Sequence, residues 1–409
     1  MIPFSPPRID QKIIDEVTAV LRSGWITTGP KTKLFEKKLV EYIGCNAVVC
    51  VNSATAGLEL VLRWYGVTKG DEVILPAYTY AATANVIVHC GAKPVFVDVN
   101  KDDFNISVPA IEKAITPRTK VIMPVDFGGM PCDYSAINAL VKKENILKKF
   151  KPKTAEQKKL KRILMLSDSA HSLGAHSDNV KTGNLSDISV FSFHAVKNLS
   201  TAEGGAIALN LPEKFNSEQL YRTLSVKVLH GQNKDALDKF KKGNWKYDIV
   251  EAGYKCNMTD ISAVMGLVEL DRYDHDTLVK RKQIFDRYSK LLSKYDWAEL
   301  PVAMTNKAGI KTEGSYHLFP LRIKNMNENQ RDRIIQEIFD QDVSVNVHFI
   351  PVPMMSFYKR SGYNIKNYPI AYNNYSREIS LPVFYDLTEE QIKTVVEAVV
   401  NAVKQIADV

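Results

Sequence analysis

The chain has 409 residues, of which 45% are hydrophobic and 24% charged, and its formal net charge is +8 at pH 7. This is the composition of a globular protein that is long enough for two domains. No apolar run approaches the roughly 18–20 residues that a membrane-crossing helix requires. The first residues also lack the basic-then-apolar pattern of a signal peptide, so we expect a cytoplasmic protein without membrane contact.

The five cysteines are an odd number, and the chain contains no C-x-x-C pair: Cys45, Cys50, Cys90, Cys132 and Cys256. This pattern fits neither a disulfide framework nor a zinc site. We expect buried, reduced thiols and no bound metal.

The positive charge is concentrated in one segment. Ten Lys and Arg residues lie between Lys142 and Arg162, against only Glu144 and Glu156, so the rest of the chain is close to neutral. Proteins that bind single-stranded nucleic acid interleave basic and aromatic residues, and Phe150 is the one aromatic residue here. The segment therefore predicts a solvated surface insertion rather than a nucleic-acid site.

From about residue 45 to 210, short β-branched runs alternate with helical stretches. The runs that predict strands are Ala47–Asn52, Glu72–Pro76, Pro94–Val99, Lys120–Val125, Ile163–Ser167, Ser189–His194 and Ala206–Leu209. The stretches between them that predict helices include Ala56–Tyr65, Ala81–Cys90 and Tyr134–Lys143. Such alternation favours an α/β fold with a largely parallel sheet covered on both faces.

The last third of the chain predicts a smaller α+β unit. Its expected elements are a helical stretch at Asp260–Tyr295, a strand at His317–Ile323, a helix at Asn329–Asp340, a strand at Ser344–His348 and a helix at Thr388–Ala407. Thr388 and Gln391 are spaced as a capping box at the start of the last helix. We place the domain boundary near residue 275, which gives a large domain 1–275 and a small domain 276–409.

Ligands of parallel sheets bind at the carboxyl ends of the strands. The first strand expected here runs into Val51-Asn-Ser-Ala-Thr-Ala-Gly-Leu58. Small residues at a helix start allow a phosphate to approach free N–H groups, so Ser53, Ala54 and Thr55 are candidates for a phosphate cradle. An ordinary helix cap explains the same residues equally well.

Three further strand ends carry candidate residues. Leu75-Pro-Ala-Tyr-Thr-Tyr80 offers an aromatic ring for stacking, and we favour Tyr80 over Tyr78. Leu166-Ser-Asp-Ser-Ala-His171 places the Asp168 carboxylate at a strand end, with His171 three residues on. A capping aspartate and a surface histidine are the alternative for that pair.

Lys197 follows the strand in Phe191-Ser-Phe-His-Ala-Val-Lys197 and precedes a glycine pair, Gly204-Gly205. A lysine in a buried loop loses hydration, which lowers its pKa and frees the amine for Schiff-base chemistry. Considered alone, such a lysine is more often a solvated loop residue.

Taken in this order, the segments resemble the DegT/DnrJ/StrS family of nucleotide-sugar aminotransferases, which use pyridoxal 5′-phosphate. The resemblance covers almost the whole chain, through Ser23-Gly-Trp-Ile-Thr-Thr-Gly-Pro30, Gly91–Asp98, Gly253–Ile261 and Ser380-Leu-Pro-Val-Phe384. It implies the aspartate-aminotransferase-like (type I) fold, and a homodimer whose subunits share active sites.

The resemblance also implies roles for particular residues. Lys197 matches the lysine that forms the Schiff base, and Asp168 matches the partner of the pyridine nitrogen. His171 would lie beside the ring hydroxyl, and Tyr80 would stack on the ring. Phosphate contacts match Ser192, Ala54 and Thr55. Many members read Gly-Tyr-Asn-Tyr-Arg where the neighbouring subunit contributes, whereas this chain has Lys255 and Asn257, which are therefore candidates only.

This version of the motifs is similar to that of the enzymes that make UDP-4-amino-4-deoxy-L-arabinose. The similarity implies amination of a 4-keto group with L-glutamate as donor, in ping-pong order. His194, His348, Trp25 and Thr28 are candidate substrate contacts. Packing in the core or at an interface remains the alternative for each of them.

Rival interpretations remain open on sequence alone. A pyridoxal enzyme acting on amino acids commonly needs an arginine for the substrate carboxylate, and Arg322 or Arg377 could be imagined in that role. A non-catalytic sugar-sensing protein could share the fold. Related keto-sugar dehydratases carry His at the position of Lys197, and this chain does not.

Overall fold

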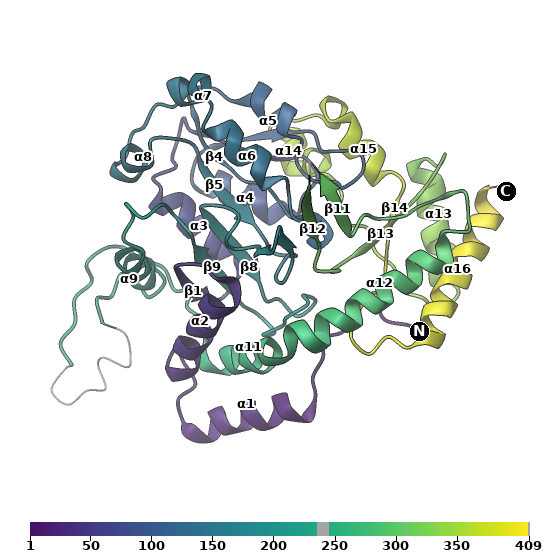
Figure 1. The fold of residues 1–409 in the computed structure, drawn as a ribbon, viewed down its shortest axis with the longest axis horizontal. Coiled ribbons are helices and arrows are strands. Elements are labelled where there is room, and N and C mark those ends of the chain that lie inside the picture. The colour runs from purple at the N-terminus through teal and green to yellow at the C-terminus, as the bar shows by residue number, and fades with distance from the viewer. Residues whose placement is uncertain (235–244, 308, 408–409) are drawn as a thin grey trace.

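The computed structural model describes residues 1–234, 245–307 and 309–407. Its centre is a seven-stranded sheet with the order β1-β9-β8-β5-β4-β2-β3 (Figure 1). The strands are β1 (Ala47–Val51), β2 (Glu72–Pro76), β3 (Lys93–Val97), β4 (Thr119–Ile122), β5 (Leu164–Asp168), β8 (Ile188–Ser192) and β9 (Gly205–Leu209). Only β9 runs antiparallel to its neighbours in this sheet. The mostly parallel α/β prediction and all seven strands are confirmed, with ends shifted by a few residues.

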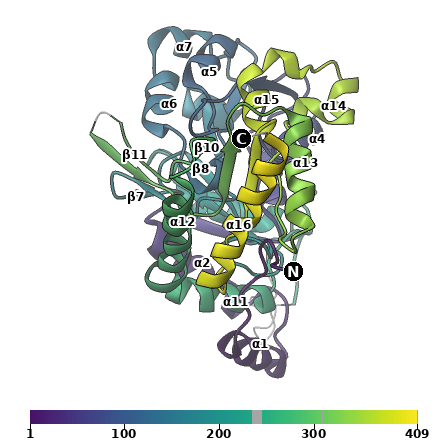
Figure 2. The ribbon, with the colours of Figure 1, turned by 90° about the vertical axis from the view of Figure 1, so that its right-hand side faces the viewer.

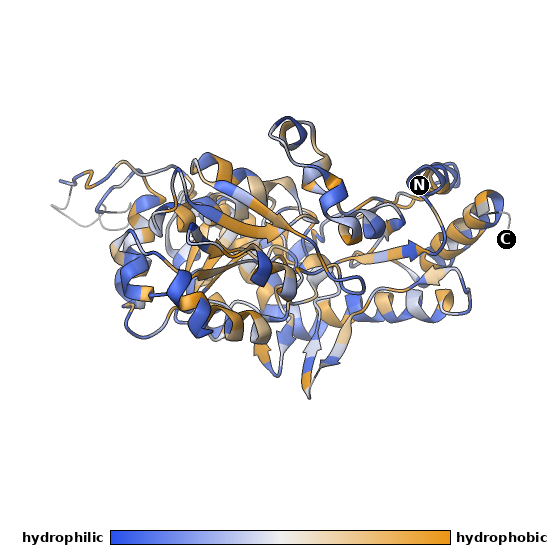
Figure 3. Cartoon of the chain, turned by 90° about the horizontal axis from the view of Figure 1, so that it is seen from above, coloured by the Kyte–Doolittle hydropathy of each residue, from blue (hydrophilic) through white to orange (hydrophobic). Residues whose placement is uncertain are grey.

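Helices cover both faces of this sheet. One face carries α3 (Ala54–Trp64), α4 (Ala81–His89) and α9 (Ser217–Lys227). The other carries α2 (Pro30–Ile43) and α11 (Asp260–Arg272), and farther along α5 (Val108–Ala114) and α6 (Tyr134–Val141). Because side chains alternate along a strand, Val49 and Val51 join the first core, whereas Val48 and Cys50 join the second. The central strands are accordingly orange in the hydropathy view of Figure 3.

A separate apolar core forms in the C-terminal part. There α12 (Leu278–Leu292), α13 (Glu328–Phe339) and α16 (Glu389–Ala407) accompany an antiparallel sheet with the order β10-β13-β14. Its strands are β10 (Ala298–Glu299), β13 (Phe319–Ile323) and β14 (Glu378–Leu381). Figure 2 shows α13 and α16 side by side. The Thr388–Gln391 capping box is confirmed by its two reciprocal bonds of 3.0 and 3.2 Å. The boundary near residue 275 stays a prediction.

Two predicted elements are wrong. The segment 344–348 is not a strand, although it lies beside β14 through an isolated bridge between Asn346 and Ser380. The ladder stops because the backbone N–H of His348 bonds the Glu378 carboxylate instead of a backbone carbonyl. The helix expected over 260–295 is interrupted by a π-helical turn at Tyr273–Thr277 that separates α11 from α12.

Several small elements had no sequence prediction. A four-stranded sheet joins β11 (Met304–Lys307), β12 (Ile310–Glu313), β6 (His176–Ser177) and β7 (Val180–Lys181). The remaining helices are α1 (Gln11–Ser23), α7 (Glu144–Lys149), α8 (Ala155–Leu160), α14 (Ser356–Arg360) and α15 (Pro369–Tyr375), with 3-10 turns at Phe127–Gly129, Val352–Met354 and Ile365–Asn367. Within the described ranges, no helix has the length and apolar character needed to cross a membrane.

Candidate active site

A cavity of about 360 Å³ opens at the carboxyl ends of β5 and β8, beside the start of α3. Ten of the fourteen candidate residues line it: Ser53, Ala54, Thr55, Tyr80, Asp168, His171, Ser192, His194, Lys197 and His348. The strand ends thus bring together side chains that are far apart in the sequence, as expected for a parallel sheet.

Lys197 lies in the loop after β8 and is half-buried. The turn that carries it is closed by a bond from its backbone N–H to the His194 carbonyl, at 2.9 Å. Loss of hydration lowers the pKa of the Lys197 amine to about 8, and the nearby Asp168 charge opposes this shift. The amine is therefore available as a nucleophile and as a proton carrier close to neutral pH.

Asp168 is the last residue of β5 and is buried. The Thr83 hydroxyl of α4 donates to its Oδ2 at 2.7 Å, and the Ala170 N–H donates to Oδ1 at 3.3 Å. Burial raises the pKa of the Asp168 carboxyl, while these bonds and Lys197 lower it. A buried carboxylate of this kind suits a cationic ring nitrogen as partner. Thr83 was not predicted, because nothing in the sequence shows that the start of α4 faces β5.

His171 is buried, and its Nδ1 has no hydrogen-bond partner in the described part of the chain. Its ring lies 4.3 Å from that of His317, centroid to centroid. Asn198 fixes His317, because the His317 Nδ1 and the Asn198 Oδ1 are 2.8 Å apart. Burial and the Lys197 charge lower the pKa of His171, so its ring is neutral. His317 also lines the cavity and was not among the sequence candidates.

The start of α3 forms a cradle. The Ser53 side chain caps the helix by accepting from the Ala56 N–H at 3.2 Å, and Ala54 and Thr55 form the first turn. Gly205 of β9 packs so closely here that a Cβ would lie 2.6 Å from the Ala54 nitrogen. The free N–H groups and the positive end of the helix suit a phosphate.

Tyr80 and Tyr78 have different surroundings. Tyr80 is 62% exposed, and its ring centroid lies 5.7 Å from that of Phe349 at the cavity. Tyr78 is fully buried, and its hydroxyl donates to the His348 carbonyl at 2.6 Å. Tyr80 is therefore the tyrosine that could cover a ring bound in the cavity.

Trp25, Thr28, Lys255 and Asn257 form a second cluster beside the cavity rather than lining it. The Asn257 Nδ2 donates to the Thr28 Oγ1 at 2.5 Å, and the Lys255 amine donates to the Asn257 Oδ1 at 2.6 Å. The Trp25 indole donates to the Thr28 carbonyl at 3.2 Å. Asn257 also pairs with Val51, two residues before Ser53.

Arg322 and Arg377, the arginines imagined for a substrate carboxylate, lie away from the cavity. Both pair with Glu299, at 2.6 and 2.9 Å. Neither arginine lines the cavity, and Glu299 already engages both guanidinium groups, so neither is placed to bind a substrate carboxylate there.

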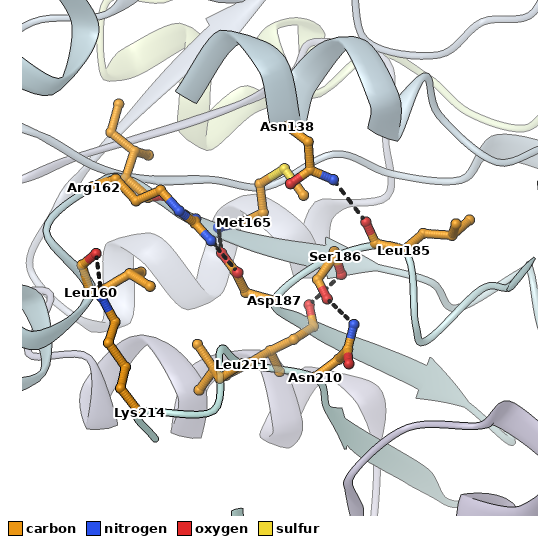
Figure 4. Close-up of polar contacts among 12 residues, drawn as sticks. Asn138, Leu160, Arg162, Met165, Leu185, Ser186, Asp187, Asn210, Leu211 and Lys214 are labelled. Atoms are coloured by element: carbon orange, nitrogen blue, oxygen red, sulfur yellow. Dashed lines mark hydrogen bonds and ion pairs between the residues drawn. The ribbon is translucent and has the colours of Figure 1, made fainter. Parts of the chain in front are cut away.

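The basic segment 142–162 lies before β5, at the opposite end of that strand from Asp168. Its last residue is anchored in the protein, as Figure 4 shows: two Arg162 nitrogens bond the Asp187 carboxylate at 2.7 and 2.6 Å. Lys143 and Lys153 pair with Glu112 and Asp71. The segment is thus a surface insertion remote from the cavity.

Comparisons with known proteins agree with this geometry. A sequence model of the DegT/DnrJ/EryC1/StrS aminotransferase family matches residues 7–148 and 153–400, so the match is interrupted inside the basic segment. The spore coat polysaccharide biosynthesis protein SpsC of Bacillus subtilis is 35% identical, covering 98% of this chain and 97% of its own. The uncharacterized protein MJ1066 of Methanocaldococcus jannaschii is 37% identical, with coverages of 99% and 98%.

Solved structures give the same picture. The PMP-form of the putative sugar aminotransferase Spr1654 from Streptococcus pneumoniae is similar with a TM-score of 0.94 and 43% identity, covering 99% of this chain and 100% of its own. Its PLP-form gives a TM-score of 0.93 and 42% identity, with 99% of each chain covered. Helicobacter pylori PseC, an aminotransferase of pseudoaminic acid biosynthesis, is 26% identical with a TM-score of 0.83 and 99% coverage of each chain.

Proposed function

The chain belongs to the DegT/DnrJ/EryC1/StrS aminotransferase family, and from this premise we propose that it transfers an amino group from L-glutamate to a nucleotide-linked keto-sugar. The observation that carries the proposal is the amine of Lys197, with its pKa lowered to about 8, in one cavity with the buried Asp168 carboxyl.

The cavity fits pyridoxal 5′-phosphate, the cofactor of this family. The cradle of Ser53, Ala54 and Thr55, with Ser192 at the end of β8, would hold the phosphate. The unpartnered Nδ1 of His171 is a buried polar atom that needs a ligand, and the ring hydroxyl of the cofactor would supply it. Asp168 would keep a proton on the ring nitrogen, and Tyr80 would cover the ring.

Bound pyridoxal phosphate supplies a ring that accepts electrons from the substrate carbon that loses its proton. Lys197 provides the amine to which the cofactor attaches at rest. The same Lys197 amine would also move a proton from or to the substrate carbon, once for each substrate. A pKa of about 8 lets Lys197 both take up and return that proton near neutral pH.

The nucleotide-linked 4-keto-sugar is the finer part of the proposal. It is supported by the names of SpsC and PseC, which refer to polysaccharide and pseudoaminic acid biosynthesis. His194 and His348 line the cavity where a sugar would lie, and Trp25 and Thr28 lie beside it. With Arg322 and Arg377 engaged by Glu299, an amino acid as the only substrate is disfavoured. We propose that the protein is located in the cytoplasm.

We also propose a homodimer. Between residues 245 and 254 several large hydrophobic side chains are exposed: Trp245 is 77% and Val250 58% exposed, and Tyr247, Ile249 and Tyr254 are exposed as well. This segment directly precedes Lys255 and Asn257. A second copy that covered it would bring the second cluster to the neighbouring cavity and complete its phosphate site.

The test is the visible absorbance of the purified protein, loaded with pyridoxal phosphate, before and after L-glutamate is added. We expect a yellow band that bleaches in the parent and in the control Lys148→Ala, whereas Lys197→Ala does not turn over. The bleached protein should recover its band with a UDP- or dTDP-linked 4-keto-sugar, with dTDP-4-keto-6-deoxyglucose as the first probe.

Failure to bind the cofactor would overturn the enzyme proposal and favour a sugar-sensing protein. Bleaching without recovery by any of these sugars would overturn the nucleotide-sugar part alone.

A further inference from the structure

A chain of three side chains runs from the small sheet to the cavity. The Ser380 hydroxyl donates to the Glu378 Oε1 at 2.5 Å, and the His348 Nδ1 lies 3.0 Å from the Ser380 Oγ. Glu378 is held in place, because its Oε2 accepts from the His348 backbone N–H at 3.0 Å. Glu378 and Ser380 are fully buried on β14, whereas His348 lines the cavity.

His348 is the member of this hydrogen-bonded series that faces the cavity. No described residue bonds the Nε2 of His348, and its ring stacks on Phe4 with centroids 5.5 Å apart. With Nδ1 engaged by Ser380, Nε2 is the atom that His348 can offer to a bound molecule.

The directions of these hydrogen bonds link the protonation state of Glu378 to the tautomer of His348. An ionised Glu378 only accepts, so Ser380 must give it the hydroxyl proton and can then only accept from a His348 Nδ1–H. In that state Nε2 carries a lone pair. A protonated Glu378 can donate to Ser380, which then donates to Nδ1, and in that state Nε2 carries the proton.

The charge surroundings disfavour a cationic His348. Burial and Lys197 lower the pKa of His348 to about 3, so its ring stays neutral above pH 5. Burial raises the pKa of Glu378 to about 8, against the bonds from Ser380 and the His348 backbone and the charges of Arg331 and Arg322. The titratable and charged groups that face the chain are Arg322 on β13, Arg331 on α13, Tyr78 after β2, Lys197 after β8, and His171 and His317.

We propose that Glu378, Ser380 and His348 form a proton relay, in which the proton on Glu378 decides whether His348 presents a donor or an acceptor to the cavity. A proton that enters at Nε2 releases the Nδ1 proton to Ser380, whose own proton passes to Glu378. On the His348 ring an N–H bond forms at Nε2 as the one at Nδ1 breaks, so the ring never becomes an imidazolium. At the Ser380 Oγ one O–H bond forms and one breaks, and the proton ends on Glu378.

The use of the relay rests on the proposed function. A keto oxygen and the carboxylates of glutamate only accept hydrogen bonds, so they require the donor form of His348. A sugar hydroxyl can pair with either form. Glu378 and Ser380 are therefore positioning residues, which act on substrates through His348.

The test follows the His348 tautomer by ¹⁵N NMR of histidine-labelled protein loaded with pyridoxal phosphate, from pH 6 to 10. His348→Gln identifies the signal among the eight histidines. We expect Nε2–H at pH 6 and Nδ1–H at pH 10, with a midpoint near 8. A single tautomer throughout, or an imidazolium, would overturn the relay.

Variants separate the relay from a merely structural role. Ser380→Ala and Glu378→Gln should each abolish the pH-dependent exchange, whereas Ser380→Thr, which keeps the hydroxyl, should retain it. If the exchange persists in either of the first two variants, the relay is wrong. Because the NMR readout needs no turnover, it decides the relay separately from the glutamate experiment, which decides the proposed function.

Discussion

The reactivity of Lys197 results from two opposing influences on one amine. Burial lowers its pKa and the Asp168 charge raises it, which leaves a value of about 8. At pH 7 about a tenth of the amine is then neutral, compared with well under a thousandth for an ordinary lysine.

This pKa predicts the pH dependence of cofactor capture. The neutral amine is the nucleophile, so the rate at which cofactor-free protein binds pyridoxal phosphate should rise about tenfold per pH unit below 8 and level off above it. Asp168→Asn removes the charge that raises the pKa of Lys197, so the pH at which the rate levels off (the bend in the pH–rate curve) should be lower in this variant. The growth of the absorbance band measures the rate, and a bend near pH 10 would contradict the account.

At the residue scale, the sequence predicted the site residues that lie at or shortly after the ends of strands. Asp168 ends β5 and Lys197 lies in the loop after β8, so their position at the edge of the sheet could be predicted from the apolar runs before them. Thr83, His317 and Glu378 could not, because each acts through a contact with a distant segment, such as the bond from Thr83 to Asp168. Ser380 lay in a recognised motif, but its spacing gave no hint of His348.

At the element scale, the close approach of β9 and α3 shapes the phosphate cradle. Gly205→Ala would place a methyl group 2.6 Å from the Ala54 nitrogen and push the start of the helix away. We expect at least about tenfold weaker binding of pyridoxal phosphate, measured by equilibrium titration.

The control for this substitution is Gly362→Ala. Its backbone φ is +90°, and a Cβ there meets nothing within 4 Å, so it costs stability without changing the cavity. Equal loss of cofactor affinity in both variants would show that Gly205 has no local role.

The basic insertion is held by its final ion pair. Arg162→Ala leaves the buried Asp187 without its partner, and the side chains are only 11% and 6% exposed. We expect a loss of about 3 kcal/mol in the free energy of unfolding, measured by urea denaturation. Lys148→Ala, which breaks an exposed pair with Glu144, should change stability by less than about 0.5 kcal/mol. A similar small loss in both variants would refute the anchoring role.

Periodicity predicted the central strands and their helices well because those strands are apolar on both faces. It failed at 344–348, where alternation is present but the Glu378 side chain takes the next ladder bond. It also failed at the π-helical turn 273–277, because no Gly or Pro in the sequence marks the interruption of the helix.

At the scale of the whole molecule, the second cluster raises the question of which cavity it serves. If Asn257 completes the neighbour's site, mixing Lys197→Ala with Asn257→Ala should restore activity, because one site of each mixed dimer is then intact. Transamination with L-glutamate measures the recovery. No recovery, with mixed dimers shown by mass spectrometry, would place Asn257 in the cavity of its own subunit.

The central claim is that Lys197 carries the cofactor, and borohydride reduction followed by peptide mass spectrometry tests it most directly. Reduction of the loaded protein fixes pyridoxal phosphate on the amine that holds it. We predict the added mass on the peptide that contains Lys197, and none on that peptide once L-glutamate has bleached the protein. Modification of a different lysine, or none before bleaching, would contradict the account.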